Sequence, residues 1–185
     1  MHSGARRNLI SLPSSALSFP SPRCACRVSS VLNGSREYGK QNLFDGRPES
    51  CWNSDQGTPQ FIQIAFERPV DLESVGITFQ GGFVGRSCAL SVTNAASPKR
   101  LVQLHIWEPR DTNDPQHFVI TPPADAPAAA CQVTNLKLTF PASTDFFGRI
   151  TIYALEITGK PSAASGAAEA AGADSAAAAA TAPSS

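Results

Sequence analysis

Apolar and polar residues alternate along much of the region 27–160. In the segment 75–80, Val75, Ile77 and Phe79 fall on one face of an extended backbone, and small or polar residues fall on the other. Successive side chains of a β-strand point to opposite faces, so this pattern predicts a strand. The pattern recurs at short intervals along the region. The expected strands are 27–32, 61–66, 75–80, 88–93, 101–107, 116–121, 132–140 and 149–158.

The segments between these strands are rich in Gly, Pro, Asn and Asp, the residues that favour turns. No segment shows the period of a helix that packs one face on a core. Short strands separated by such turns are typical of an all-β sandwich or barrel. The sequence therefore predicts one all-β domain over residues 27–160.

The two ends of the chain differ from this middle region in composition. Residues 1–26 contain arginine, serine and proline but no acid, and the first carboxylate of the chain is that of Glu37. Such a composition favours either an organelle transit peptide or a disordered leader. Residues 161–185 hold thirteen alanines, interrupted by glycine and proline, and no aromatic residue. This composition predicts a disordered tail.

Charge and cysteine content narrow the class of protein. The 185-residue chain carries 15 basic and 15 acidic residues, so its overall charge does not favour nucleic acid or an acidic membrane as a partner. Its five cysteines cannot all pair within one chain, and Cys24 and Cys26 lack a second ligand pair at zinc-finger spacing. An odd number without a pairing pattern is typical of a reducing compartment. We therefore expect an intracellular protein of the nucleus or cytoplasm, or of an organelle if the leader is a transit peptide.

Three loops combine aromatic rings, polar groups and glycine: 49–57 (ESCWNSDQG), 79–86 (FQGGFVGR) and 144–149 (TDFFGR). If each connection reverses the chain, as in antiparallel sheets, these loops and a fourth at 108–115 fall at one end of the sandwich. Loops on a rigid sandwich that carry rings and polar groups are common binding sites. We name this end the rim. Its candidate binding residues are Trp52, Asn53, Asp55, Gln56, Gln80, Phe83, Arg86, Asp145, Phe147 and Arg149.

The first of these residues also have a structural interpretation. Trp52 can close the end of the sandwich as a buried ring, because tryptophan is mostly buried in folded proteins. Asn53, Asp55 and Gln56 can cap turns through hydrogen bonds to their own backbone. The sequence leaves both interpretations open for this loop.

The last rim loop allows a prediction for each of its large side chains. Arg149 is expected to pair with a carboxylate of the rim, either Asp145 or Asp55. If this stretch is extended, neighbouring side chains point in opposite directions. We therefore expect Phe146 in the core and Phe147 facing solvent.

The order of the motifs resembles a known family. The chain contains VSSVLN (28–33), NLFDGRPESCWNSDQG (42–57) and VGITFQGGF (75–83), and ends its domain with FFGRITIYALEITG (146–159). These motifs are similar to those of the discoidin domain, also called the coagulation factor 5/8 type C or galactose-binding-like domain. CWNSDQG, FQGGF and TDFFGR together resemble, more narrowly, the testicular-orphan-nuclear-receptor-associated protein subfamily. The resemblance covers residues 27–160.

The resemblance implies an eight-stranded jelly-roll β-sandwich without catalytic machinery, with its binding loops at one end. Members of the superfamily bind glycans, lipid headgroups or proteins through those loops. The narrower subfamily is an intracellular partner of a nuclear receptor and dampens its transcriptional activity. The resemblance therefore implies a protein-binding module, with a carbohydrate-binding module using the same loops as the alternative.

The resemblance also bears on disulfides and metal ions. Extracellular discoidin domains usually join their two ends by a disulfide, whereas no cysteine follows Cys131 here, which favours an intracellular protein. Related domains hold a structural calcium near the start of the domain and on its last strand, and Asp45 and Glu156 occupy matching positions. Calcium takes about six to eight oxygen ligands, and only these two side chains are candidates. The sequence therefore predicts no cofactor, with a structural calcium at Asp45 and Glu156 as the alternative that the resemblance implies.

No catalytic arrangement is visible in the sequence. It contains no glycine-rich phosphate loop, no Ser/His/Asp set and no metal-binding cluster. It also has no run of eighteen apolar residues, the usual length of a membrane span. We therefore expect a non-enzymatic protein. The resemblance implies a transcription regulator or nuclear receptor as its partner, with a glycan as the alternative ligand.

Overall fold

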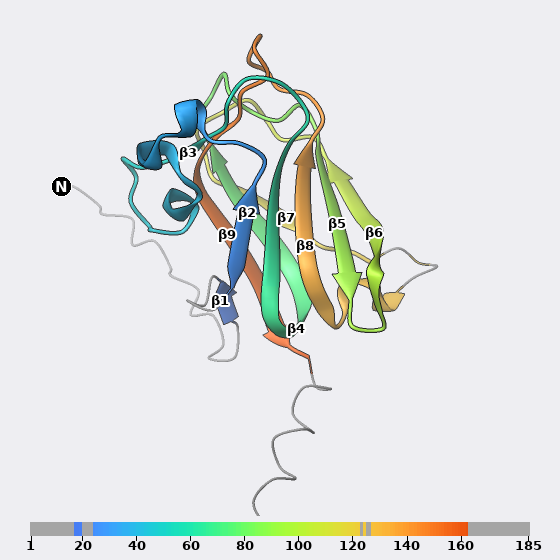
Figure 1. The fold of residues 1–185 in the computed structure, drawn as a ribbon. Coiled ribbons are helices and arrows are strands. Elements are labelled where there is room, and N and C mark those ends of the chain that lie inside the picture. Colours follow the sequence, from blue (N-terminus) through green and yellow to red (C-terminus); the bar gives the residue numbers. More distant parts are fainter. Residues whose placement is uncertain (1–16, 20–23, 123, 125–126, 163–185) are drawn as a thin grey trace, which may run out of the picture.

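The structure, a computed structural model, describes the central part of the chain and a short piece of the leader (Figure 1). The transit-peptide and disordered-tail hypotheses concern segments that lie almost wholly outside the described residues, and both stay predictions. The described residues are 17–19, 24–122, 124 and 127–162.

The described elements are nine β-strands and four short 3₁₀ helices. Every expected strand segment overlaps an observed strand, which confirms the all-β prediction. The elements are β1 (Leu17–Phe19), β2 (Ala25–Val28), η1 (Leu32–Gly34), η2 (Arg36–Tyr38), η3 (Lys40–Leu43), β3 (Trp52–Asn53), β4 (Gln60–Phe79), β5 (Cys88–Asn94), β6 (Ser97–Trp107), β7 (Gln116–Val119), η4 (Pro127–Ala130), β8 (Val133–Phe140) and β9 (Thr151–Pro161).

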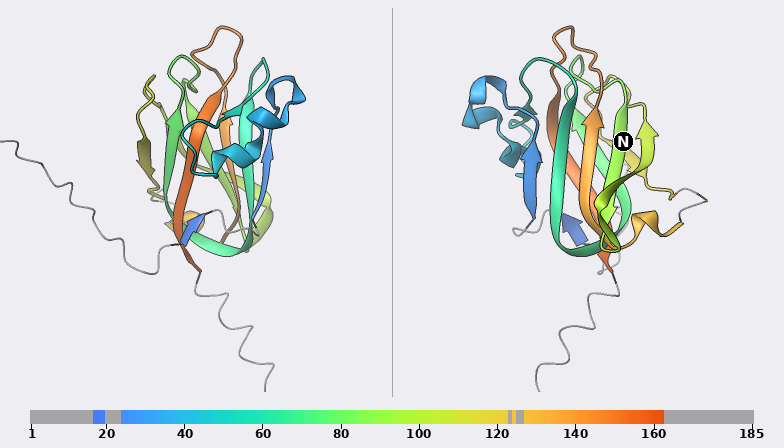
Figure 2. Two further views of the ribbon diagram at one scale, coloured as in Figure 1. Left: turned by 90° about the vertical axis from the view of Figure 1, so that its left-hand side faces the viewer. Right: turned by 45° about the vertical axis from the view of Figure 1, so that its right-hand side comes forward.

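Two antiparallel layers form a β-sandwich (Figures 1 and 2). One layer contains β2, the first half of β4, β8, β5 and β6. The other contains β9, the second half of β4 and β7, and the short strands β1 and β3 pair with the far side of β9. This arrangement places both faces of the core between antiparallel strands, as expected for a jelly roll.

Strand β4 is where the fold departs most from the sequence prediction. We expected two strands, 61–66 and 75–80, separated by a turn. The structure instead has one continuous strand of 20 residues, which bends and crosses from one layer to the other (Figure 1). Its pairing with β8 shifts register between Ala65 and Val70, and beyond the bend it pairs with β9. The chain direction still reverses as expected, because the bend in β4 turns the chain at the place where the sequence predicted a turn.

The folded part also begins earlier than residue 27. Residues 25 and 26 belong to β2, and β1 pairs with β9 through Leu17↔Gly159 and Phe19↔Ile157. At the other end, β9 continues to Pro161, and the Ser162 amide donates to the carbonyl of Pro69 at 3.1 Å. Part of the expected leader is therefore strand.

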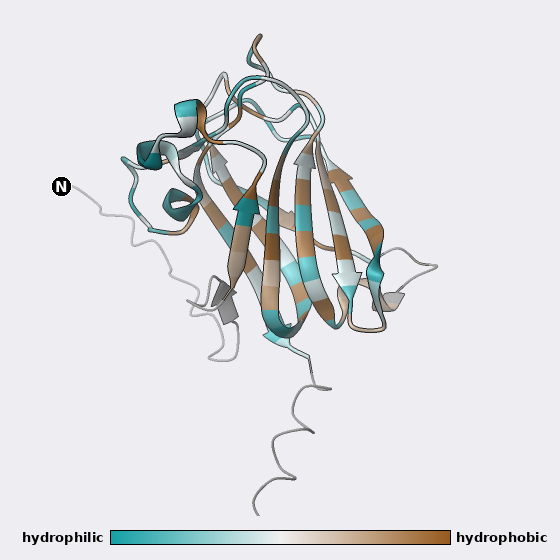
Figure 3. Ribbon diagram, in the orientation of Figure 1, coloured by the Kyte–Doolittle hydropathy of each residue, from teal (hydrophilic) through white to brown (hydrophobic). Residues whose placement is uncertain are grey.

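The core lies between the two layers, as the alternating colours along the strands show (Figure 3). Phe79 of β4 and Phe140 of β8 are fully buried and meet edge to face, with ring centroids 6.0 Å apart. Trp107 of β6 stacks on Phe118 of β7 at 4.8 Å and so connects the two layers on one side. Such aromatic pairs add to the stabilisation from burial alone.

The 3₁₀ helices η1, η2 and η3 close the opposite side of the sandwich, between β2 and β9 (Figure 2), whereas η4 contacts β4, β5 and β6. Helix η3 contacts β9, β3 and β2, and its Leu43 is buried in the core. None of the described helices is long and apolar enough to cross a membrane. The segment 44–51 that follows η3 leads to the rim.

Candidate functional site

The four rim loops form one surface held together by hydrogen bonds. The Gly57 amide donates to the Phe147 carbonyl at 2.8 Å, and the Thr144 amide donates to the Val84 carbonyl at 2.8 Å. The fourth loop joins through Asn113, whose Oδ1 accepts from the Gly81 amide at 2.7 Å. The structure therefore confirms that all four loops lie at one end, the upper end in Figure 1.

Trp52 does not belong to the exposed surface of the rim. Its side chain is fully buried, and its Nε1 donates to the Ser30 carbonyl at 3.0 Å. The residue lies on β3, paired with Ile152 of β9, which turns the ring into the core. The ligand-binding interpretation of Trp52 is therefore wrong, and the structural one is confirmed.

A buried amide, that of Gln60, fixes the loop that contains Asp55. Gln60 Nε2 donates to the carbonyls of Asp55 and Gly57 at 3.0 and 2.7 Å, while its Oε1 accepts from the hydroxyls of Ser29 and Ser30. Sequence reasoning missed Gln60, although the Ser-Ser pair that it binds was part of the recognised motif. These four hydrogen bonds to the Gln60 side chain fix the conformation of the loop.

Of the polar residues in this loop, one stabilises a turn and another is exposed to solvent. Asp55 is half-buried, and its Oδ1 accepts from the Gln56 amide at 2.9 Å, so it caps its own turn as one interpretation predicted. Gln56 is exposed. Asn53 pairs with Thr151 across β3 and β9, and among the described residues its Oδ1 and the Thr151 hydroxyl are buried without a hydrogen-bond partner.

An ion pair shapes the last rim loop. Arg149 donates to both carboxylate oxygens of Asp145, with Nε–Oδ2 at 3.0 Å and Nη2–Oδ1 at 3.1 Å. The same carboxylate accepts the backbone amides of Phe147 and Arg149 at 3.2 and 3.1 Å. Gly148, at φ +81°, allows the tight turn that these bonds require. Of the two carboxylates expected as partners of Arg149, Asp145 is the one observed.

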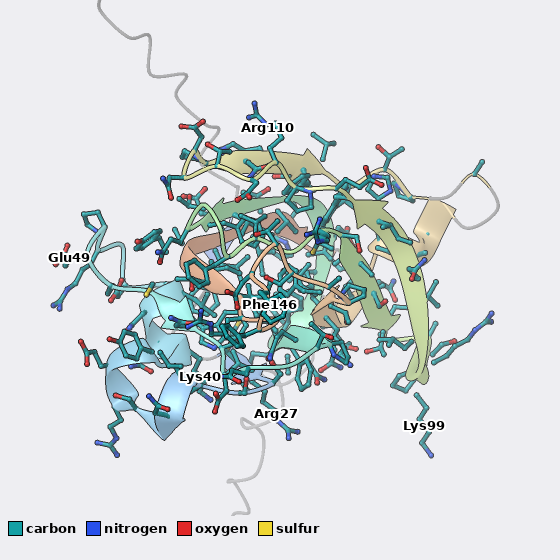
Figure 4. The ribbon with its side chains drawn as sticks, turned by 90° about the horizontal axis from the view of Figure 1, so that it is seen from above. Arg27, Lys40, Glu49, Lys99, Arg110 and Phe146 are labelled. Carbon is teal, nitrogen blue, oxygen red and sulfur yellow. The ribbon has the colours of Figure 1, made fainter. Side chains whose placement is uncertain are left out.

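This turn places two aromatic rings in solvent. Phe146 is 94 % exposed and Phe147 is 53 % exposed, and their rings meet edge to face at 5.3 Å. Seen from above, Phe146 lies at the centre of the rim (Figure 4). The expectation that Phe146 lies in the core is wrong, because the chain turns at residues 145–148 instead of running extended.

A cation completes the aromatic surface. The Arg149 guanidinium lies 5.0 Å from the ring centre of Phe83 and 5.5 Å from that of Phe147, within the range of cation–π attraction. The set Phe83, Phe146, Phe147 and Arg149 therefore joins two rim loops, and we name it the aromatic platform.

The remaining rim residues, Gln80 and Arg86, lie beside the platform. Gln80 is half-buried, and its backbone amide donates to the Thr151 carbonyl while its carbonyl accepts from the Phe83 amide, both at 3.0 Å. Arg86 is exposed, and its Nε donates to the Ser143 carbonyl at 2.9 Å. Arg86 thus links two rim loops, whereas Gln80 links its own loop to the start of β9.

The two calcium candidates do not form a cage of side chains. Asp45 is exposed, and its two oxygens accept from the Arg47 amide at 3.0 Å and the Ser50 hydroxyl at 2.7 Å. The Ser50 bond and then the Arg47 amide lower the pKa of Asp45. Glu156 is exposed on β9, and within the described part of the chain no three His, Cys, Asp or Glu side chains are grouped to hold a metal ion. The described side chains around Asp45 and Glu156 supply fewer oxygen ligands than calcium usually takes, and calcium binding at these residues stays an untested hypothesis.

Similarity to known proteins decides the family. The nuclear receptor 2C2-associated protein of Xenopus tropicalis is 43 % identical over 134 residues, which cover 72 % of this chain and 91 % of the relative. The human protein of the same name is 39 % identical over 140 residues, covering 75 % of this chain and 94 % of the relative. The chain belongs to the nuclear receptor 2C2-associated protein family. It matches no protein-family model.

Comparison with solved structures identifies the fold of this member of the nuclear receptor 2C2-associated protein family. The F5/8 type C domain of a Bacteroides fragilis protein superposes with a TM-score of 0.65 at 18 % identity, covering 80 % of this chain and 99 % of that domain. A family 32 carbohydrate-binding module from Clostridium perfringens, in complex with galactose, gives 0.61 at 13 % identity and covers 77 % and 98 %. The fold is thus that of a discoidin-type β-sandwich, as the sequence motifs implied.

The substitution Asp145→Asn is expected to remove a pH-dependent contribution to stability. The hydrogen bond from the Arg149 side chain is the main cause that lowers the pKa of Asp145 below its ordinary value of 3.8. A lowered pKa in the folded state means that the ion pair stabilises the fold above that ordinary value, and that this contribution is lost as the pH falls through the lowered one.

Urea unfolding of both proteins between about pH 6 and about pH 2.5 would measure this contribution. We expect the wild type to exceed the variant by about 1 kcal/mol or less near pH 6, since solvent screens a pair at the surface. The difference should shrink on acidification. A difference that grows as the pH falls would show that the carboxylate does not stabilise the turn by its charge.

Proposed function

We propose that this member of the nuclear receptor 2C2-associated protein family is a non-catalytic module that binds a protein partner through the rim. The observation that carries the proposal is the exposure of Phe146 and Phe147 on a loop that the Asp145–Arg149 pair holds rigid. Burial of large rings in a partner releases water from apolar surface, and exposed aromatic residues are enriched at binding sites. A rigid loop loses little conformational entropy on binding.

The names of the relatives support a nuclear receptor as the partner. They are called nuclear receptor 2C2-associated proteins, and the chain spans about nine-tenths of their length. By this similarity we propose a nuclear receptor or another transcription regulator as the partner, with modulation of transcription as the consequence. The discoidin-type fold on its own selects no partner, because such folds carry many unrelated sites.

A glycan is the second candidate ligand of the rim. Sugar-binding sites offer an aromatic face beside polar and charged groups, and the aromatic platform provides a half-exposed ring, Phe147, next to Arg149 and Asp145. The galactose complex of a module with the same fold supports this reading of the platform. The two candidates differ in what must be bound, so one set of measurements distinguishes them.

The test uses the full-length chain and purified nuclear receptor 2C2. Biolayer interferometry with the receptor immobilised should give saturable binding, and the same chain on a glycan array should give no signal above background. Binding to a galactose-containing glycan that free galactose competes away, with no binding to the receptor, would instead favour the carbohydrate module. Binding to neither the receptor nor a glycan would contradict both candidate functions, and another protein would then have to be tested as the partner.

A further inference from the structure

The outer face of the layer β9–β4–β7 is hollow because small residues occupy several of its outward-facing positions. Gly76 and Thr78 of β4 and Ala154 of β9 form the floor, and Thr78 lies directly opposite Ala154 in the register. Gly76 is flanked on its two sides by His117 of β7 and Glu156 of β9. A Cβ at position 76 would lie 3.2 Å from the His117 ring and 3.3 Å from the Glu156 Cβ. The side chains of His117 and Glu156 therefore occupy the space beside Gly76 that a larger residue would need.

Two loops raise walls on either side of this floor. The segment after η3 contributes Arg47 and Pro48, and the loop 108–115 contributes Asn113. Together with the floor they enclose an open cleft of about 470 Å³, adjoined by a smaller hollow of about 80 Å³ beside His117. A cleft of this volume lies within the usual range for bound ligands. It lies on the side of the sandwich, below the rim, and contains no residue of the aromatic platform.

The charged groups of the cleft are available to a ligand. Arg47 on one wall and Glu156 on the floor are both exposed, and neither forms a salt bridge among the described residues, although the charge of Arg47 contributes to the lowered pKa of Asp45. Tyr153, which is half-buried, also lines the cleft. Asn113 adds a side-chain amide, whose Oδ1 accepts from the Gly81 amide at 2.7 Å.

We propose that this cleft binds an extended peptide segment that carries an acidic side chain for Arg47 and a basic side chain for Glu156. Small apolar residues between the two charges would lie on Ala154 and Thr78, where the floor leaves room for them. Complementary charges select the orientation of such a segment. An uncharged glycan fits less well, because it offers no opposite charge to either Arg47 or Glu156.

The proposal goes beyond a partner bound at the rim, since the cleft and the aromatic platform are separate surfaces. The loop 108–115 borders both the cleft and the rim, because Asn113 lines the cleft and also accepts from the amide of Gly81 in the rim. A partner at the rim could therefore continue into the cleft, but peptide binding in the cleft does not require the rim.

The experiment selects phage-displayed random decapeptides on the immobilised full-length chain and measures the enriched peptides by fluorescence polarisation. The variants are Arg47→Glu, Glu156→Lys and Ala154→Trp, which fills the cleft without altering its charges. Lys99→Glu is the matched charge-reversal control on the opposite side of the molecule (Figure 4). All variants are checked for native unfolding temperature before use.

We expect enriched peptides to carry an acidic and a basic residue separated by small apolar ones. Each charge reversal should weaken binding about tenfold or more, with partial recovery when the peptide charge that faces the reversed residue is also reversed. The control should leave binding unchanged. Peptides without this charge pattern, peptides insensitive to both charge reversals, or peptides lost only in a Phe146→Ala variant would each overturn the proposal. So would selective binding of glycans that depends on Glu156.

Discussion

Trp52→Ala should lower the free energy of unfolding by about 3–5 kcal/mol, the range measured for removal of a large buried ring. The ring is fully buried at the rim end of the core, and its Nε1 donates to the Ser30 carbonyl. The substitution therefore removes the packing of the ring and leaves a cavity and an unpaired carbonyl. Urea unfolding followed by circular dichroism measures the loss.

Two further substitutions separate the causes of this loss. Trp52→Phe keeps most of the packing but removes the hydrogen bond, so we expect an intermediate loss of roughly 1–3 kcal/mol. Val119→Ala, at a position that is 70 % exposed, should stay within about 0.5 kcal/mol of the wild type. If Trp52→Ala costs no more than Val119→Ala, the ring does not close the core, and its role as a ligand contact would have to be reconsidered.

The strands were predictable because most of them have one face on the core and one in solvent. A period of two is then imposed on five or more residues, as in β8, where Leu136, Leu138 and Phe140 are buried and Lys137 and Thr139 are half-exposed. The three-residue strand β1 and the two-residue strand β3 are too short to show any period. Their place depends on pairing with β9, which is distant in sequence.

The bend of β4 shows a different limit of sequence reasoning. Residues 67–74 contain a proline, three acids and a basic residue, which is the composition of a surface turn. In the structure Pro69 lies within the register shift of the pairing with β8, between Ala65 and Val70, and from Val70 on the strand pairs with β9 without a break. Local composition predicted the reversal of the chain correctly, but whether hydrogen bonding continues through it depends on which strands lie alongside.

The rim was predictable at the level of loops and less so at the level of side chains. Antiparallel reversal fixes the end of the sandwich at which each loop lies, so the position of the loops followed from the strand count. The direction of Phe146 depends on Asp145, whose carboxylate accepts two backbone amides and thereby turns the chain. An acid followed three residues later by glycine is a turn signal, and it was the available evidence against an extended segment.

Replacing Phe146 and Phe147 together by alanine should abolish most of the affinity for the protein partner while leaving the fold intact. Aromatic residues at the centre of an interface typically contribute about 2–4 kcal/mol each on truncation, or roughly thirtyfold to a thousandfold in Kd. Both rings are exposed in the free chain, so their removal costs little stability. Biolayer interferometry with immobilised nuclear receptor 2C2 measures the affinity, and thermal unfolding checks the fold.

The matched control is the double variant Ile106→Ala/Val119→Ala, which removes two apolar side chains that are 56 % and 70 % exposed but belong to strands below the rim. If the rim binds the partner, the control keeps the wild-type affinity while the phenylalanine variant loses it. Equal losses in both would mean that exposed apolar area, and not its place on the rim, governs the interaction. Full affinity in the phenylalanine variant would show that the rings of Phe146 and Phe147 do not contact the partner. The aromatic platform would then not be part of the binding site.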